Sequence, residues 1–112
     1  MTIRELAEKL DAEVCHDRFE DVEISAAYTS DLLSDVMAHA KDGGALITIQ
    51  AHKNTVAVAT LMDLSVIIIC NSSPLPDDML EAAGNEGIAV LRTKENQFAV
   101  SGKVWGLLGN NG

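Results

Sequence analysis

Short apolar runs, rich in β-branched residues, recur along the chain at intervals of about 21 residues. Three of these runs are almost continuously apolar, which is typical of strands covered on both faces in a parallel sheet. A shorter stretch, Glu13–Cys15, is predicted as a further strand near the start of the chain. The main runs, each predicted as a strand, are Ile24–Tyr28, Ala45–Ile49, Val66–Cys70 and Ile88–Leu91.

Amphipathic segments lie between these runs and predict helices. In the first, Ser30-Asp31 offers an N-cap and Gly43-Gly44 is expected to end the helix. Its predicted apolar stripe comprises Leu32, Leu33, Val36, Met37 and Ala40. In the second segment, Asn54 is a candidate cap for a helix that carries Val58, Leu61 and Met62. The alternation of valine and alanine over residues 56–59 also suits a strand, so both interpretations stay open.

Three more helices are predicted from their boundaries and apolar faces. Pro76, followed by Asp77 and Asp78, favours a helix start, and Gly87 is expected to end that helix. At the front of the chain, Thr2 and Glu5 have the spacing of a capping box. A last helix follows Leu91 and carries Phe98, Val104, Trp105 and Leu108.

This alternation of strands and helices predicts the fold class. It indicates an α/β protein, a three-layer α/β/α sandwich with a mainly parallel sheet of four or five strands. No linker or low-complexity segment divides the chain, so residues 1–108 are expected to form a single domain. Residues 109–112, Gly-Asn-Asn-Gly, are expected to be a disordered tail.

Charge and composition narrow the possible partners and the compartment. Seventeen acidic residues against eight basic ones give a net charge of −9, and the basic residues are scattered. Such a surface repels nucleic acid and anionic membranes, which we therefore exclude as partners. The longest strongly apolar run, Val66–Cys70, is far too short to span a bilayer. Cys15 and Cys70 show no disulfide spacing, which favours reduced thiols and a cytoplasmic location.

Ligands of parallel α/β sheets bind beyond the carboxyl ends of the strands, where helix N-termini also point. Four polar loops of this chain are expected at that edge, the last of them containing Thr93 and Lys94. The other interpretation is that Ser30, Asn54 and Ser73 are only helix caps and turn formers. The candidate ligand-binding residues are Thr29, Ser30, Asp31, His52, Lys53, Asn54, Asn71, Ser72, Ser73 and Thr93.

Catalytic and cofactor motifs are sparse. The three histidines are scattered and show no metal-ligand spacing, so no metal site is predicted. Neither a phosphate-binding P-loop nor a G-x-G-x-x-G fingerprint occurs, and no cofactor is expected. His52 and Cys70 both follow predicted strands and are the one pair that could act as base and nucleophile. Cys70 completes an apolar run, however, and is interpreted as inert core.

Much of the chain resembles a DRTGG domain, from about Ile24 to Val104. The similar segments are Tyr28–Met37, Ile47–Asn54, Val66–Ser73, Pro76–Ala83, Gly87–Thr93 and Phe98. The resemblance implies a non-catalytic accessory domain that helps subunits associate. Similar domains accompany phosphotransacetylases and CBS-containing pyrophosphatases, and the N-terminal domain of HPr kinase is alike. The kinase activity itself is not implied, because the ATP-binding loop belongs to that enzyme's other domain.

The motif that names the family is altered here. His52-Lys53 stands where Asp-Arg is expected. Asn71-Ser72-Ser73 stands where Thr-Gly-Gly is expected, or Cys70-Asn71-Ser72 in another register. A glycine pair lets backbone N–H groups approach a ligand closely, and Asn-Ser does so less readily.

Three functional hypotheses follow. The first is a homodimeric regulatory or scaffolding domain, accessory to a metabolic or redox enzyme complex. Phe98 and Trp105 are candidates for the dimer surface, although aromatic side chains on a terminal helix more often belong to the core. The second is a sensor that binds a nucleotide or other small anion at the loops beyond the carboxyl ends of the strands, through Ser30, Lys53, Asn54 and Ser72. The third is a hydrolase or transferase that uses His52 and Cys70.

Overall fold

Five strands and five helices are found in residues 1–109, the part of the chain that the computed structural model describes. The strands are β1 (Glu13–Val14), β2 (Ala27–Thr29), β3 (Ala45–Thr48), β4 (Val66–Ile69) and β5 (Ala89–Arg92). The helices are α1 (Ile3–Lys9), α2 (Leu33–His39), α3 (Lys53–Leu61), α4 (Asp77–Glu86) and α5 (Gln97–Leu107). Of the tail predicted at 109–112, residues 110–112 lie outside the described residues.

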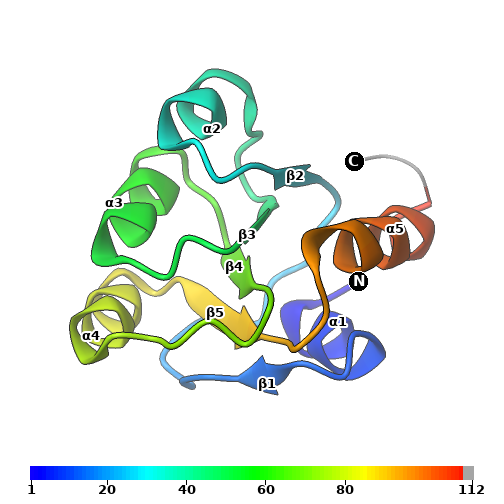
Figure 1. Ribbon diagram of the computed structural model, residues 1–112, viewed down its shortest axis with the longest axis horizontal. Coiled ribbons are helices and arrows are strands. Elements are labelled where there is room, and N and C mark those ends of the chain that lie inside the picture. Colours follow the sequence, from blue (N-terminus) through cyan, green and yellow to red (C-terminus); the bar gives the residue numbers. More distant parts are fainter. Residues whose placement is uncertain (110–112) are drawn as a thin grey trace.

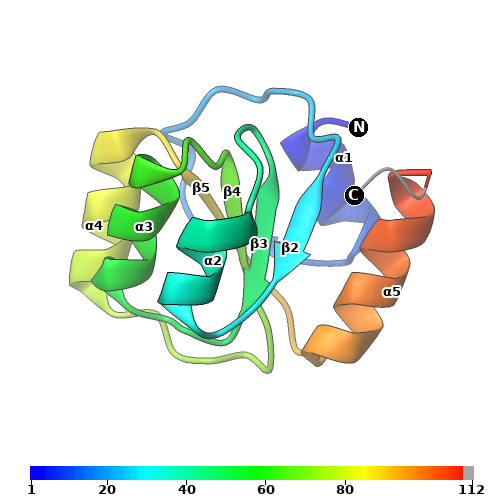
Figure 2. The ribbon, with the colours of Figure 1, turned by 90° about the horizontal axis from the view of Figure 1, so that it is seen from above.

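The strands form one sheet in the order β1-β5-β4-β3-β2. Strands β2 to β5 run parallel, and β1 pairs antiparallel with β5 at one edge. Helices α2, α3 and α4 cover one face, and α1 and α5 cover the other, as Figure 1 and Figure 2 show. The predicted three-layer α/β/α sandwich with a mainly parallel sheet is therefore confirmed.

Strand β4 shows why the apolar runs are continuous. Its four side chains are all buried, and they alternate between the two faces of the sheet. Val66 and Ile68 belong to the core beneath α1 and α5, whereas Ile67 and Ile69 belong to the core beneath α2, α3 and α4. A strand covered on both faces has no side exposed to water, so its sequence does not alternate between apolar and polar residues.

The first apolar run forms a shorter strand than predicted. Strand β2 covers only Ala27–Thr29, and Ile24 is buried outside the sheet. The N–H of Ile24 donates to the carbonyl of Met1, and Thr2 forms an isolated antiparallel bridge with Glu23. This stretch pairs with the N-terminus instead of β3, because the chain folds back there.

The boundary predicted for α2 at Gly43-Gly44 is wrong, since the helix ends at His39. Gly43 has a φ of +74°, and its N–H donates to the Asp63 carbonyl over 2.7 Å. A Cβ atom on Gly44 would lie 3.0 Å from the carbonyl oxygen of Lys41. The two glycines therefore serve the tight turn that leads into β3.

The predicted apolar stripe of α2 is only partly buried. Val36 is fully buried, whereas Leu32 is 65% and Met37 43% exposed. Residues 53–61 form helix α3, which settles the choice between helix and strand. Helix α4 ends at Gly87 in the left-handed conformation, as predicted.

Helix α5 presents its two aromatic side chains to solvent. Val100 and Val104 are buried against the sheet, whereas Phe98 is 89% and Trp105 54% exposed. The expectation that these aromatic side chains belong to the core is wrong, because the helix buries Val100 and Val104 instead and leaves both aromatic side chains exposed. No helix among residues 1–109 is long and apolar enough to cross a membrane.

Candidate binding site at the carboxyl edge of the sheet

The carboxyl ends of β2 to β5 meet at one edge of the sheet, where the sequence predicts its ligand-binding residues. The structure brings these residues to that edge but does not unite them in one site. Ser72 and Thr93 line one pocket, Lys53 and Asn54 line another, and Thr29 lines a third. The remaining candidates form internal hydrogen bonds of the loops.

Asp31 is the centre of a hydrogen-bond network at this edge. Its Oδ1 accepts from the Thr48 hydroxyl over 2.8 Å, from the Ile49 N–H over 2.9 Å and from the Gln97 amide over 3.0 Å. The Gln50 amide donates to the Asp31 carbonyl over 3.2 Å. Asp31 therefore joins the loop after β2 to the end of β3 and the start of α5, and its role is structural.

Of the interpretation of Ser30, Asn54 and Ser73 as helix caps and turn formers, the part that concerns caps is wrong. Ser30 is a turn former, since its hydroxyl accepts the N–H of Leu32 over 3.2 Å. The N-cap positions of α2, α3 and α4 are occupied by Leu32, His52 and Pro76. His52 caps α3 through its ring, since Nδ1 accepts the N–H of Asn54 over 3.0 Å. Histidine is an unusual cap, so the usual preference for Ser, Thr, Asp and Asn at this position does not predict it.

Two further candidates are engaged with distant elements. The hydroxyls of Thr29 and Ser101 are 2.7 Å apart and link β2 to α5. The Lys53 ammonium lies 4.0 Å from the Asp78 carboxylate at the start of α4, and both side chains are largely exposed. The hypothesis that Ser30, Lys53, Asn54 and Ser72 hold one anion together finds no common pocket in the structure.

The turn after β4 is left-handed at two consecutive residues. Asn71 has a φ of +60° and Ser72 a φ of +50°. The N–H of Asn71 donates to the Glu95 carbonyl over 2.9 Å, and that of Ser72 donates to the Thr93 carbonyl over 2.8 Å. These N–H groups hold the loop after β5 in place, so they are not free to cradle an anion.

The left-handed pair indicates which register of the family motif applies. Glycine adopts a positive φ without steric cost, whereas other residues do so at a cost. The two residues with positive φ are Asn71 and Ser72, not Ser72 and Ser73. The register in which Cys70-Asn71-Ser72 takes the place of Thr-Gly-Gly therefore fits the backbone.

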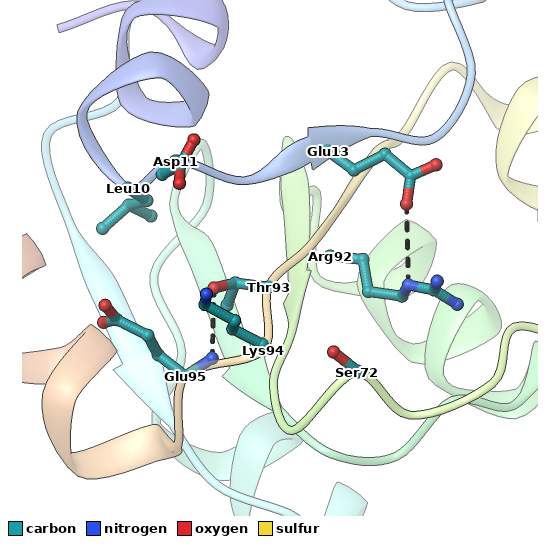
Figure 3. A pocket seen from close by; sticks show the side chains of 8 residues that line it. All are labelled: Leu10, Asp11, Glu13, Ser72, Arg92, Thr93, Lys94 and Glu95. Atoms are coloured by element: carbon teal, nitrogen blue, oxygen red, sulfur yellow. Dashed lines mark hydrogen bonds and ion pairs between the residues drawn. The ribbon is translucent and has the colours of Figure 1, made fainter.

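A pocket of about 270 Å³ lies beside this turn, between the loops after β4 and β5 and the chain before β1. Figure 3 shows Ser72, Lys94 and Glu95 entering it from the two loops, and Glu13 entering from β1. The pocket is lined by Leu10, Asp11, Glu13, Ser72, Arg92, Thr93, Lys94 and Glu95.

The charges of this pocket are mixed. Arg92 Nε lies 3.6 Å from the Glu13 carboxylate, and the Lys103 ammonium lies 2.7 Å from the Glu95 carboxylate. Among the described residues, Lys94 has no ion-pair partner. The lining offers a guanidinium, an ammonium and hydroxyls as donors, together with carboxylates.

Sequence reasoning missed most of this lining. Arg92 ends a strand predicted to stop at Leu91, and Glu13 belongs to a strand whose partner was unknown. Asp11, with a φ of +51°, turns the chain from α1 toward β1. The signal that could have found them is the antiparallel pairing of the leading strand with β5, which places Glu13 opposite Arg92.

Cys70 lacks the properties of a nucleophile. Its side chain is fully buried in the core beneath α1 and α5, and burial raises the pKa of the thiol to about 11. The thiol points to the Ile68 carbonyl, while His52 is occupied in capping α3. The geometry agrees with the interpretation of Cys70 as core and opposes the hydrolase or transferase hypothesis.

A second polar cluster joins β2 to α2. The Tyr28 hydroxyl donates to Asp35 Oδ2 over 2.8 Å, and His39 Nδ1 lies 2.9 Å from Asp35 Oδ1. The hydrogen bond from Tyr28 is the main cause that lowers the pKa of Asp35, and the same bond raises the pKa of Tyr28. Within residues 1–109, no group of three or more acidic, histidine or cysteine side chains is arranged to hold a metal ion.

Comparisons with known proteins identify relatives of this fold. The family profile described as the DRTGG domain matches residues 5–105. No curated protein sequence matches the chain. A similar crystal structure contains the CBS and DRTGG domains of the regulatory region of Clostridium perfringens pyrophosphatase, complexed with the activator diadenosine tetraphosphate.

That structure shares the fold with a TM-score of 0.74 at 15% sequence identity. The match covers 92% of this chain and 45% of the pyrophosphatase chain. The present chain therefore spans less than half of the regulatory region to which it is similar. At this identity the comparison shows the fold, and the ligand named above is that of the pyrophosphatase region.

Proposed function

This chain belongs to the DRTGG domain family, and on that premise we propose that it is a non-catalytic regulatory or scaffolding domain that acts as a homodimer. In the pyrophosphatase neighbour, a DRTGG domain is part of a regulatory region. By analogy, we take this chain to be accessory to a metabolic or redox enzyme complex. The two free cysteines, Cys15 and Cys70, support a cytoplasmic location, and we take residues 1–108 as the single domain.

The exposure of Phe98 and Trp105 on α5 carries the proposal of pairing. Phe98 is 89% exposed, although aromatic side chains contribute more to buried cores and interfaces than almost any others. Isolated exposed apolar residues are common on protein surfaces, but here two aromatic side chains share one helix face. A protein partner that covers this face removes apolar surface from water.

The mass of the protein in solution tests this proposal. We expect sedimentation or light scattering at 10–100 µM to give twice the mass of an 11.9 kDa chain. Dilution should convert the dimer to a monomer with a single dissociation constant. A monomer throughout this concentration range overturns the proposed homodimer.

A second candidate function is the sensing of a small polar ligand in the pocket beside β5. It is supported by Lys94, which has no ion-pair partner among residues 1–109, and by the hydroxyls of Ser72 and Thr93 in the same lining. The ligand class that the sequence suggests is a nucleotide or other small anion.

Thermal unfolding with diadenosine tetraphosphate, ATP and inorganic phosphate tests whether this pocket binds a small anion. If the pocket binds one of them, the Tm of the protein rises, and Lys94→Ala abolishes the rise. Lys53→Ala is the matched control, because Lys53 lies at α3 outside this pocket. No shift with any probe, or equal loss in both variants, rejects this pocket as the site.

A further inference from the structure

The acidic residues of the chain are unevenly distributed. All 17 precede residue 96, and the last of them is Glu95. Helix α5 therefore contains no carboxylate, and its one charged side chain, Lys103, is paired with Glu95 over 2.7 Å. In a chain of net charge −9, α5 is a helix that a second copy can approach without meeting acidic side chains on the helix itself.

The outer face of α5 carries both aromatic side chains and glycines. Phe98 and Trp105 lie one above the other on this face, two turns apart, with Gly102 between them. An added Cβ atom on Gly102 or Gly106 would meet nothing within 4 Å. The backbone of α5 is thus uncovered at these two positions, beside the exposed rings.

Hollows flank this face on both sides. A cavity of about 110 Å³ lies between α5 and the edge strand β2 and is lined in part by Trp105. Another, of about 420 Å³, lies toward α1 and is lined by Lys9, Gly102, Lys103, Gly106 and Leu107. Figure 2 shows α5 at the right, as the outermost element on the face of the sheet opposite α2, α3 and α4.

We propose that a second copy of this chain packs on the outer face of α5, with the two α5 helices antiparallel and a twofold axis beside Gly102. This inference rests on the proposed homodimer and assigns its interface. The spacing is self-complementary, because Phe98 and Gly106 lie equally far from Gly102 along the helix. Each Phe98 ring then covers the uncovered backbone at Gly106 of the other copy, as an isologous contact requires.

Charge and packing both favour this arrangement over one through α1 or α4. Helices α1 and α4 carry acidic residues, among them Glu5, Glu8, Asp77, Asp78 and Glu81. Two copies that met through such helices would bring like charges together, which is unfavourable. On α5 the glycine backbone allows close approach, and each buried phenylalanine removes a large apolar area from water.

Disulfide trapping at the axis tests the interface. We expect Gly102→Cys to form a covalent dimer under mild oxidation, because residues on a twofold axis come within disulfide distance. Leu61→Cys is the matched control, since Leu61 is 69% exposed on α3, on the other side of the sheet. The parent chain is the second control, with Cys15 half-buried and Cys70 buried.

A second pair of variants tests the aromatic contact without any new cysteine. Phe98→Ala should raise the dissociation constant of the dimer at least tenfold, whereas Leu61→Ala should leave it unchanged. Because Phe98 is 89% exposed, its removal does not weaken the core. The circular dichroism spectrum should therefore match that of the parent, and so should the Tm measured at a concentration where both proteins are monomeric, since dimerisation itself raises Tm.

The outcomes separate the interface from the homodimer itself. A parent chain that is dimeric, but whose Gly102→Cys variant does not crosslink and whose Phe98→Ala variant keeps its affinity, refutes the α5 interface and leaves the homodimer standing. A parent chain that is monomeric refutes both. Equal crosslinking of Gly102→Cys and Leu61→Cys also refutes the α5 interface, since it indicates random collision.

Discussion

The side-chain amide of Gln97 donates to the carboxylate of Asp31 over 3.0 Å, across 66 positions of the chain. This contact fastens the first turn of α5 to the loop after β2. It thereby sets where the next residue, Phe98, emerges from the surface. The same Asp31 oxygen accepts from Thr48 and Ile49 at the end of β3, so one carboxylate holds three segments at the edge of the sheet.

Replacing this carboxylate should therefore destabilise the fold. Asp31→Ala leaves the buried hydroxyl of Thr48 without its acceptor, and we expect the free energy of unfolding to fall by about 3 kcal/mol. Urea denaturation measures the change. The control is Asp42→Ala, at an exposed loop position, which should alter stability by less than about 0.5 kcal/mol. Equal effects of the two substitutions would show that the Asp31 network is not structural.

The left-handed turn after β4 gives a second prediction. Ser72→Gly should raise the free energy of unfolding by about 0.5–1 kcal/mol, because glycine adopts the φ of +50° without steric cost. The neighbouring Ser73 does not have a positive φ. Ser73→Gly should therefore lower stability by about 0.5 kcal/mol, since it only adds freedom to the unfolded chain. Stability changes of the opposite order would contradict the turn geometry.

The two thiols should react slowly in the folded protein. Burial raises the pKa of both Cys15 and Cys70 to about 11, and only the thiolate is nucleophilic. At pH 7.5 we expect modification by a disulfide reagent to be roughly a hundredfold slower than for a free thiol. The rate should climb about tenfold per pH unit until pH approaches 11, as the thiolate fraction grows.

Unfolding in urea should abolish this protection of both thiols, which provides the control for the reagent. Rapid modification of Cys70 in the folded protein at neutral pH would show an accessible thiolate. That result would restore the hydrolase or transferase hypothesis.

The Tyr28 hydrogen bond should be visible in the titration of Asp35. Its carboxyl pKa is lowered below 3.8, first by Tyr28 and then by Ser30 and His39. A carboxyl pKa that is lower in the folded than in the unfolded state stabilises the fold at every pH above the unfolded-state pKa. This stabilisation is lost as the pH falls through the folded-state pKa. Tyr28→Phe should shift the midpoint seen by NMR upward. His39→Ala should shift it less, and the reverse order would mean that His39 dominates.

The periodicity of the chain is sufficient to predict the layers of the fold. An unbroken apolar run such as Val66–Cys70 is typical of a strand that helices cover on both faces, because neither face is then exposed to water. The ends of helices can also be predicted where they depend on local chemistry, as at Gly87 and at the capping box of Thr2 and Glu5. These features depend on neighbours within a few residues, so the local sequence is enough to predict them.

The pocket beside β5 is different, because it is made by pairing between distant segments. Glu13 lies opposite Arg92 only because the leading strand adds antiparallel to β5. Likewise, the Ile24 segment pairs with the N-terminus, and His52 takes a capping role that residue preference does not favour. The candidate residues lie at the carboxyl edge of the sheet, where the sequence places them, but their division among three pockets was not predictable.

The sequence alone therefore dictates a three-layer sheet protein and the edge at which its polar loops gather. It does so because burial on two faces and helix capping each produce a pattern of residue types that repeats or ends within a few positions of the chain. Only the tertiary structure decides that Phe98 and Trp105 face solvent, since the face that a helix buries depends on its orientation against the sheet. It also decides that the N–H groups of the turn at Asn71 and Ser72 are already occupied, because their acceptors come from a loop some 20 residues later.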